Sequence, residues 1–306
     1  MILQVLALLT LVAILTCLIA LFGKVSRLHA IEKKKQAAHT SNKLLAFYNN
    51  GFVLAHVAGI AAGSHAPVAT TLAFDHACQS LGLNGPKSGV ETVICSIAIG
   101  ERYLQSVAPC IESQRRFADA NGYEYILVEQ KPTRFDRPIP WLKIPLIAAL
   151  LQAGYQRVLY IDADAMITNH SFDIETQFSR LNAGSTGLLI SQDGRGVNSG
   201  VIFAVATPNN RRALDMIWTY DVDITNGTWE QNATNFLLNN YPEFRQVFVL
   251  EPEARTFNSF VPEREKFYPT VERIRWQAGD FICHFAGIRT PDLDQLTRDY
   301  ATKTQS

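Results

Sequence analysis

The sequence predicts an α/β domain, a β-sheet flanked by helices, that follows an N-terminal membrane anchor and a stem. Three features of the chain indicate this organisation. Residues 1–22 form an uncharged apolar run, residues 23–89 show little sustained periodicity, and from residue 90 to residue 306 strand-like and helix-like segments alternate. Such alternation is typical of parallel strands joined by helices that cover the faces of the sheet.

The first segment, MILQVLALLTLVAILTCLIALF, carries no charged residue and is long enough to cross a bilayer. A cleaved signal peptide is the competing interpretation. It would require a basic segment at its start and small residues at a cleavage site, and the sequence lacks the first and matches the second poorly. We therefore expect residues 1–22 to anchor the protein in a membrane.

Residues 23–89 are expected to form a stem with a short helix or two. Basic residues follow the anchor directly, and the small-residue stretch HVAGIAAGSHAPVATT comes later. Asn49, Gly51 and Pro67 interrupt the apolar part of this region. Because of these interruptions, no second membrane span is predicted.

The segments after residue 90 are assigned by their hydrophobic period and by flanking Gly residues. The predicted strands are ETVICSIAIG (91–100), EYILVEQ (124–130), RVLYIDADA (157–165), TGLLISQD (186–193), SGVIFAVA (199–206), FRQVFVLE (244–251) and DFICHFAG (280–287). The predicted helices are YLQSVAPCIESQRRFADANG (103–122), WLKIPLIAALLQAG (141–154), NNRRALDMIWTY (209–220) and TWEQNATNFLLNNYP (228–242). The first five elements have the order βαβαβ, and ligands of such sheets bind beyond the carboxyl ends of the strands.

The composition argues against one class of partner. The chain of 306 residues has 28 Lys and Arg against 28 Asp and Glu, so its formal net charge is zero. Nucleic-acid binding through a broad surface needs an excess of basic residues that neutralises phosphates. We therefore expect no nucleic-acid partner.

The cysteines give little information on the redox environment of the chain. Cys78 and Cys110 could pair, and nothing in the sequence shows that they do.

Two acidic residues end the apolar run VLYI. Asp162 and Asp164 stand where a buried strand ends, and ionised carboxylates are costly to bury unless a cation or another partner compensates them. In an extended chain, residues i and i+2 project to the same side, which suits one shared cation. The same Asp-x-Asp pattern at 221–223 and 292–294 closes or opens a helical stretch, where it is expected to be solvated.

Two known chemistries use an Asp-x-Asp pair at a strand end. In phosphatases of the haloacid dehalogenase type the pattern continues to Thr or Val, and a later Gly-Asp-x-x-x-Asp completes a magnesium site. Here Met166 and His284 stand at the two diagnostic positions. In sugar transfer from a nucleotide donor, the pair holds a divalent cation that neutralises the diphosphate. The departures at Met166 and His284 favour sugar transfer and leave the phosphatase as the alternative.

Seven segments occur in the order and approximate spacing seen in glycosyltransferase family 34, the retaining galactosyl-, xylosyl- and mannosyltransferases of plants and fungi. They are GYEYILVEQ, RPIPWLKIPLI, VLYIDADAMITN, GVNSGVIFAV, WEQNATNFLL, RTFNSF and AGDFICHFAG. The chain resembles this family over residues 91–290, although many members are longer. The resemblance implies a GT-A fold, which is a Rossmann-like mixed sheet flanked by helices, and a nucleotide-sugar donor, a glycan acceptor and retention of anomeric configuration.

The resemblance also implies a metal site. HFAG matches the metal-binding His of the family, so His284 is expected to join Asp162 and Asp164 around one cation. A lone His in an apolar strand is otherwise a core residue. Carboxylate oxygens with one imidazole suit Mn²⁺ better than a structural Zn²⁺ site. Mn²⁺ is the expected cofactor, and Mg²⁺ is the alternative.

The expected catalytic residues come from two segments. Glu230 and Gln231 match a pair that the family places beside the anomeric carbon, and Asp193 matches an acidic residue shortly before its Asn-Thr-Gly motif. Without the resemblance, the first two are polar residues of a first helical turn and Asp193 caps a turn. Gln231 is a poor nucleophile and Glu230 an uncertain one, so retention by same-face attack of the acceptor is favoured over a covalent intermediate.

The expected donor-binding residues are spread over the chain. Topology alone places the base and ribose after the first strand. Ser199 replaces the Thr of the family motif, and Arg289 stands near a position where the family often has Lys. The expected set is Ile99, Gly100, Tyr103, Lys143, Asp162, Ala163, Asn198, Ser199, Gly200, Gly287 and Arg289.

The expected function is therefore transfer of a hexose or pentose from a nucleotide-sugar to a glycan. The alternatives are a phosphohydrolase of the haloacid dehalogenase type and a catalytically silent, glycosyltransferase-like protein that binds a partner transferase. A complex with other glycosyltransferases is also expected for an active member.

The topology of the chain involves two opposing signals. Basic residues just after the anchor favour a cytosolic domain by the positive-inside rule. Sequons at Asn169, Asn226 and Asn232, and the Golgi location usual for the family, favour the lumen. We expect a single-pass type II protein of the Golgi membrane, with a cytosol-facing membrane protein as the alternative.

Overall fold

The computed structural model describes residues 72–133, 135–181, 186–193, 196–220, 229–266, 272–289 and 291–304. All of them lie in the unit His56–Ser306. The predicted anchor at 1–22, residues 23–71 of the predicted stem and the Asp pair at 221–223 lie outside the described residues. Among the residues that are described, no helix is long and apolar enough to cross a membrane.

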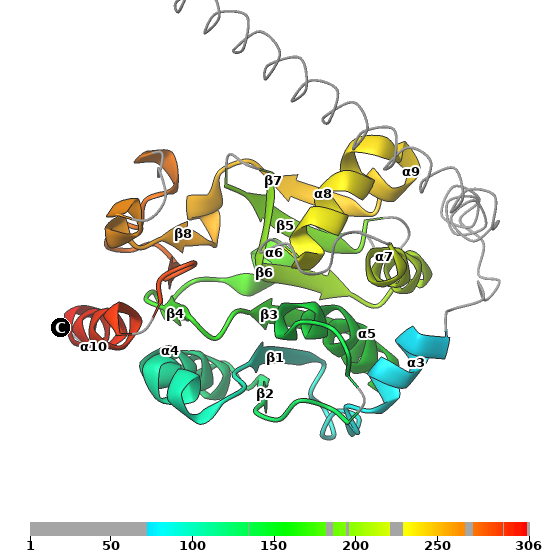
Figure 1. Ribbon diagram of the computed structural model, residues 1–306, viewed down its shortest axis with the longest axis horizontal. Helices are drawn as coiled ribbons and strands as arrows, with labels where there is room; N and C mark the ends of the chain where they lie inside the picture. Colours follow the sequence, from blue (N-terminus) through cyan, green and yellow to red (C-terminus); the bar gives the residue numbers. More distant parts are fainter. Residues whose placement is uncertain are drawn as a thin grey trace, which may run out of the picture. The chain divides into compact units, whose positions relative to one another are not determined.

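A central sheet has the strand order β2-β1-β3-β6-β5-β7, visible as a stack in Figure 1. Its strands are β1 Thr92–Ile97, β2 Glu124–Val128, β3 Arg157–Ile161, β5 Leu188–Gln192, β6 Val197–Val205 and β7 Phe248–Glu251. β1 is parallel to β2 and to β3, as the βαβαβ order predicts. β6 is antiparallel to β3 and β5, and β7 is parallel to β5. The predicted mixed sheet is confirmed.

A second, smaller sheet contains β4 Ala165–Ile167, β9 Ile282–His284 and β8 Ser259–Phe260 in the order β4-β9-β8. β4 is antiparallel to β9, and the register pairs Ala165 with His284. This pairing brings two distant parts of the sequence together. It places His284 beside the segment that links β3 to β4.

Helices cover both faces of the central sheet. On one face, Phe117 of α4 (Glu101–Ala120) and Phe178 of α6 (Ile174–Phe178) pack with Leu159 and Phe203 of the sheet. On the other, α5 (Lys143–Ala153) packs against β3 and α7 (Pro208–Thr219). The remaining helical elements are α3 Leu72–Gln79, α8 Trp229–Asn240, α9 Pro242–Arg245, α10 Asp292–Thr304, η1 Ile139–Leu142, η2 Ala254–Thr256, η3 Pro262–Lys266 and η4 Glu272–Ile274.

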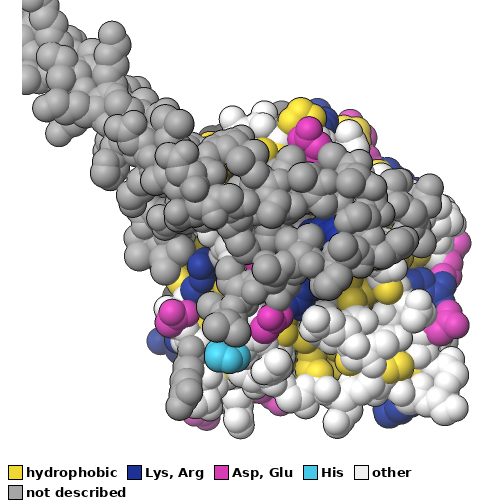
Figure 2. Space-filling view, turned by 90° about the vertical axis from the view of Figure 1, so that its right-hand side faces the viewer, with side chains coloured by type: hydrophobic (Ala, Val, Ile, Leu, Met, Phe, Trp, Pro, Cys, Tyr) yellow, Lys and Arg dark blue, Asp and Glu magenta, His cyan; other side chains and the backbone are white. Residues whose placement is uncertain are grey.

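The helix α3 lies within the predicted stem, where a short helix was expected, and packs against α5 and α7. Its Cys78 and the Cys110 of α4 are both free thiols, so this pair forms no disulfide in the structure. Figure 2 shows the face on the right-hand side of Figure 1, where Lys and Arg side chains lie among Asp, Glu and apolar ones. The charges on this face are therefore interspersed, in keeping with the zero net charge of the chain.

Local signals explain where the predicted helices begin and end. Gly154 follows α5 in the left-handed conformation with φ +113°, and its N–H bonds the carbonyls of the last turn. Thr207 caps α7 by accepting a hydrogen bond from the N–H of Asn210, with Pro208 in the first turn. α4 begins two residues earlier than predicted because Gly100, with φ +102°, stands before Glu101 as its N-cap.

The predicted strand at 157–165 is wrong in one respect. β3 ends at Ile161, and the next residues form a turn closed by a hydrogen bond of 3.0 Å from Ala165 N to Asp162 O. Asp162 and Asp164 are therefore not successive same-side positions of an extended strand. The physical reason is Gln114, a fully buried residue of α4, whose Nε2 donates to the carbonyls of Asp162 (3.1 Å) and Ala165 (2.7 Å).

Gln114→Leu is expected to lower the free energy of unfolding by about 1–3 kcal/mol, because the buried carbonyl of Ala165 would lose its side-chain donor and that of Asp162 would keep only the N–H of Ala165. Gln105→Leu is the matched control, since Gln105 is an exposed residue of the same helix and surface substitutions change stability by about 0.5 kcal/mol or less. Urea unfolding of both variants measures the difference. Equal stability of the two would contradict the role of Gln114 in closing the turn.

Candidate active site at the carboxyl end of β3

Asp162 lies in the turn after β3, and its two carboxylate oxygens have different surroundings. Asp162 Oδ1 accepts hydrogen bonds from Lys143 Nζ (3.0 Å) and Tyr160 OH (2.7 Å). Asp162 Oδ2 instead faces His284 Nε2 at 3.9 Å. The protein thus holds one oxygen in place and leaves the other directed at the imidazole.

The three predicted metal ligands converge. Asp164 Oδ1 lies 3.4 Å from His284 Nε2, and one ligand atom from each of Asp162, Asp164 and His284 lies within 4.8 Å of the others. The distances of 3.4 Å and 3.9 Å from His284 Nε2 to the two carboxylates can be spanned by one cation at about 2.0–2.2 Å from each ligand atom. Two carboxylates and one imidazole are ligands that Mn²⁺ accepts.

His284 is held in this position from three sides. Its ring is buried and stacks on Phe260 with a centroid distance of 5.3 Å. Its Nδ1 lies 2.8 Å from Asn258 Oδ1. A Cβ at Gly200 would lie 2.2 Å from His284 Cε1, so the absence of a side chain at this position gives the imidazole its space.

Lys143 carries a buried positive charge between two carboxylates. Its Nζ lies 3.0 Å from Asp162 Oδ1 and 3.1 Å from Glu230 Oε1, and its side chain is 4% exposed. Burial opposes the charge of Lys143, but the two carboxylates outweigh it and raise its pKa above the ordinary value. Burial also acts against ionisation of Asp162, yet Lys143 and His284 lower the pKa of its carboxyl.

Glu230 is buried at the start of α8. Its Oε1 accepts a hydrogen bond from Ser199 Oγ (2.7 Å) in addition to the contact with Lys143. Burial raises the pKa of the Glu230 carboxyl, and Lys143 and the Ser199 hydroxyl counteract it in part. Within the described part of the chain, Glu230 Oε2 has no hydrogen-bond partner.

The segment Asn198-Ser199-Gly200 in β6 joins the other predicted residues to this site. Gln231 Oε1 accepts from the backbone N–H of Ser199 at 3.2 Å. Asp193 is buried, and its Oδ2 accepts from Asn198 Nδ2 at 3.4 Å. Asp193 therefore supports Asn198 in this structure, and its catalytic role stays a prediction.

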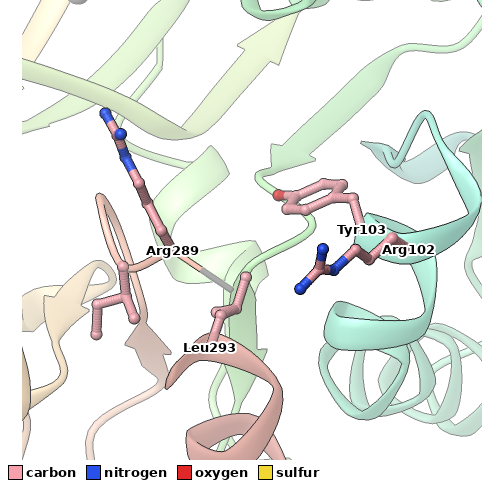
Figure 3. A pocket seen from close by; sticks show the side chains of 5 residues that line it. Arg102, Tyr103, Arg289 and Leu293 are labelled. Carbon is pink, nitrogen blue, oxygen red and sulfur yellow. The ribbon is translucent and has the colours of Figure 1, made fainter. Parts of the chain in front are cut away.

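A pocket of about 450 Å³ is lined by Arg102, Tyr103, Ile288, Arg289 and Leu293. Figure 3 shows Arg102 and Arg289 on opposite sides of it, the first from α4 and the second from the segment before α10. Burial and then the carboxylates of Asp164 and Asp162 raise the pKa of Tyr103 well above its ordinary value. The pocket therefore has two Arg side chains in its lining, together with a Tyr whose pKa responds to the Asp pair.

The structure gives the other predicted donor-binding residues different surroundings. Ala163 is buried in an apolar cluster with Cys283 and Phe285, so its side chain belongs to the core. Ile99 and Gly100 follow the carboxyl end of β1, as topology predicts, and Gly287 lies in the exposed turn after β9 with φ +80°. Their contact with a donor stays a prediction.

Sequence reasoning missed three residues of this region. Asn258, which contacts His284, lies in the quoted motif RTFNSF and could have been found there. Arg102 precedes the predicted Tyr103 and lines the same pocket. Gln114 gave no signal, because a Gln within an amphipathic helix is normally exposed.

The chain was compared with known proteins in sequence and in fold. No protein-family model matches the chain. The chain is 25% identical over 205 residues to a probable α-1,2-galactosyltransferase of Schizosaccharomyces pombe, covering 54% of the chain and 55% of that protein. It is 28% identical over 221 residues to an uncharacterized α-1,2-galactosyltransferase of the same organism, covering 60% of the chain and 56% of that protein. The chain thus matches little more than half the length of these curated relatives.

A solved structure is similar in fold. It is the crystal structure of a glycosyltransferase involved in the glycosylation of the major capsid of PBCV-1, with a TM-score of 0.52 and 15% identity. The match covers 68% of this chain and 98% of that chain. The described domain therefore has a mixed α/β fold of a kind found in glycosyltransferases, and its sequence is similar to two proteins named as α-1,2-galactosyltransferases.

Lys143→Met is expected to lower the free energy of unfolding by about 3–5 kcal/mol, because it leaves buried carboxylates without their positive partner. The double variant Lys143→Met/Glu230→Gln removes one of the two stranded charges and should recover part of the loss. Urea unfolding of the wild type, Lys143→Met, Glu230→Gln and the double variant measures this. If the double variant is as unstable as the sum of its single substitutions, the two residues do not act as a pair.

Substitution of a charged metal ligand is expected to weaken Mn²⁺ binding more than substitution of the neutral one. Asp162→Asn and Asp164→Asn should abolish it, whereas His284→Ala, which removes a neutral ligand, should weaken it by at least the roughly ten- to hundredfold that the loss of an outer-shell partner costs. Asp292→Asn is the control, because Asp292 belongs to another Asp-x-Asp pattern in the first turn of α10. Titration of Mn²⁺ followed by electron paramagnetic resonance measures the affinities. A loss in the control equal to that in Asp162→Asn would place the site elsewhere.

Proposed function

We propose that the chain is a retaining glycosyltransferase of the family 34 type, which moves a hexose or pentose from a nucleotide-sugar to a glycan acceptor. The observation that carries the proposal is the convergence of Asp162, Asp164 and His284 at the carboxyl end of β3. The fold and the two similar sequences support it. Because those relatives are named for α-1,2-galactosyl transfer, UDP-galactose is the first donor to test.

The proposed cofactor is Mn²⁺, with Mg²⁺ as the alternative, and Asp162 Oδ2, Asp164 and His284 Nε2 would hold it. A bound divalent cation stabilises the charge that develops on a departing diphosphate. Arg102 and Arg289 line the pocket that contains Tyr103, and they would supply positive charge for the same diphosphate. Lys143 keeps its charge on Asp162 and Glu230, so it positions these carboxylates.

The surroundings of Glu230 support same-face attack. A covalent intermediate would require a carboxylate that the anomeric carbon can reach, and Glu230 is only 2% exposed with Oε1 held by Ser199 and Lys143. In same-face attack, the bond from the sugar to the diphosphate breaks, the acceptor oxygen bonds to the same face, and the diphosphate takes the acceptor proton. Gln231, whose carbonyl oxygen is held by Ser199 N–H, would present its amide N–H groups to the reacting groups.

The arrangement around Asp162 supports sugar transfer over the phosphohydrolase alternative. In that alternative, Asp162 would be the nucleophile, yet its Oδ1 is bonded to Lys143 and Tyr160. Met166 is buried in β4 and offers no hydroxyl. His284 supplies an imidazole where that class has a carboxylate.

The proposal extends to the rest of the chain. Residues 1–22 would anchor the catalytic domain in the Golgi membrane as a single-pass type II protein, with the sequons in the lumen. A glycan or glycoconjugate would be the acceptor, and other glycosyltransferases would be the partners in a complex. Protease protection of the C-terminus in sealed microsomes tests the topology, and digestion without detergent would reverse it.

A screen of UDP-galactose, UDP-xylose, UDP-glucose and GDP-mannose is expected to show Mn²⁺-dependent donor hydrolysis and transfer, with UDP-galactose giving the highest rate. Proton NMR of the fresh product should show the α configuration of the donor, because same-face attack retains it. A β-linked product would contradict the retaining assignment. Metal-dependent phosphate release from phosphate esters, with no turnover of any nucleotide-sugar, would favour the phosphohydrolase instead.

A further inference from the structure

We infer that hydrogen bonds starting at the backbone of Gly200 fix the tautomer of the His284 ring. Asn198 and Asn258 are the two links between them, which makes both of them positioning residues of the cation site. The chemical consequence is that, in the neutral ring, Nε2 carries the electron pair that can bind a cation. The inference rests on the proposed cation site and adds two residues whose part in it the family resemblance did not supply.

The first link is set by the backbone. The N–H of Gly200 can only donate, and it bonds Asn198 Oδ1 at 3.0 Å. This contact identifies the oxygen end of the Asn198 carboxamide. The nitrogen end agrees, since Asn198 Nδ2 faces Asp193 Oδ2, a carboxylate oxygen that accepts, at 3.4 Å.

The second link follows from the first. The atom of Asn258 that lies 3.0 Å from Asn198 Oδ1 must be a donor, so it is Nδ2. The same Nδ2 also bonds Ser191 Oγ at 3.0 Å. Asn258 Oδ1 is therefore on the opposite side of the carboxamide, where it lies 2.8 Å from His284 Nδ1.

The imidazole must then carry its proton on Nδ1. An acceptor at hydrogen-bond distance requires Nδ1–H, and a neutral ring with Nδ1–H has its lone pair on Nε2. That lone pair faces Asp164 Oδ1 at 3.4 Å and Asp162 Oδ2 at 3.9 Å. Three electron-rich atoms facing one another are the arrangement that a cation stabilises.

The fold isolates this chain of bonds from water. Asn198, Asn258 and Ser191 are all buried, with Asn258 and Ser191 fully so. A register shift between Ile190 and Ser191 in β5 pairs Ser191 with Asn198 of β6. Asn258 precedes β8 and His284 ends β9. The bonds therefore connect the central sheet to the second sheet, and no solvent competes for the tautomer.

The test compares two substitutions at position 258. Asn258→Leu removes the acceptor for Nδ1–H. Asn258→Asp keeps that acceptor, loses the donor to Asn198 and Ser191, and adds a buried carboxylate. Asn210→Leu is the matched control, because Asn210 is also fully buried and donates to the carbonyls of Gly187 and Val205. It should lower stability without touching the imidazole.

Two readouts are measured on the full chain. Long-range nitrogen–proton NMR of the metal-free protein reports the tautomer of His284, whose signals are assigned by their loss in His284→Ala. Titration with Mn²⁺ alone reports the affinity. In Asn258→Leu, the Nδ1–H form should cease to dominate and the Mn²⁺ affinity should fall by about ten- to a hundredfold, the range seen when outer-shell partners of a metal site are removed. Asn258→Asp and Asn210→Leu should keep both readouts close to wild type.

The outcomes separate this inference from the proposed function. If Asn258→Leu keeps the Nδ1–H tautomer and the wild-type Mn²⁺ affinity, the positioning role is wrong while the metal site stands. If Asn258→Asp loses both readouts as fully as Asn258→Leu, the effect is structural, which also overturns the role. If the wild type binds no Mn²⁺ but Asn258→Leu loses the tautomer, the positioning role stands and the proposed cofactor is wrong.

Discussion

The compensation of the Asp162 carboxylate is the constraint on which the site depends. A charge at the end of an apolar strand requires partners, and Lys143 and Tyr160 supply them for one oxygen only. The second oxygen is directed at His284 together with the carboxylate of Asp164. Lys143 also compensates the buried Glu230. The same ammonium group therefore contacts a residue of the cation site, Asp162, and a residue of the segment proposed to face the sugar.

This arrangement needs a particular backbone, and the two sheets provide it. The turn after Ile161 exists because Gln114 bonds both of its carbonyls from the helix behind. The turn then leads into β4, whose pairing with β9 places His284 opposite Ala165. The conformation of the turn and the pairing of β4 with β9 therefore act together. Because Gln114 belongs to α4, a shift of this helix would alter the distance between the carboxylates and the imidazole.

Much of this could be predicted from the sequence, because periodicity and Gly positions are local signals. They indicated the strands of the central sheet and the helices that flank it. The resemblance at HFAG indicated that His284 joins Asp162 and Asp164. The turn at Asp162 could not be predicted, since its cause is a side chain 48 residues earlier in the sequence. Asn258 lies in a segment that the resemblance had indicated, but its effect on the His284 tautomer could not be predicted, because a tautomer depends on which atoms face each other in three dimensions.

The most direct test of the account is a crystal structure grown with Mn²⁺ and UDP, with data collected at the manganese absorption edge. The account predicts one anomalous peak bounded by Asp162 Oδ2, Asp164 and His284 Nε2 at about 2.0–2.2 Å, with the diphosphate on its open side. A peak away from these three residues, or UDP bound with no manganese beside them, would contradict the central claim that this cluster is the cation site.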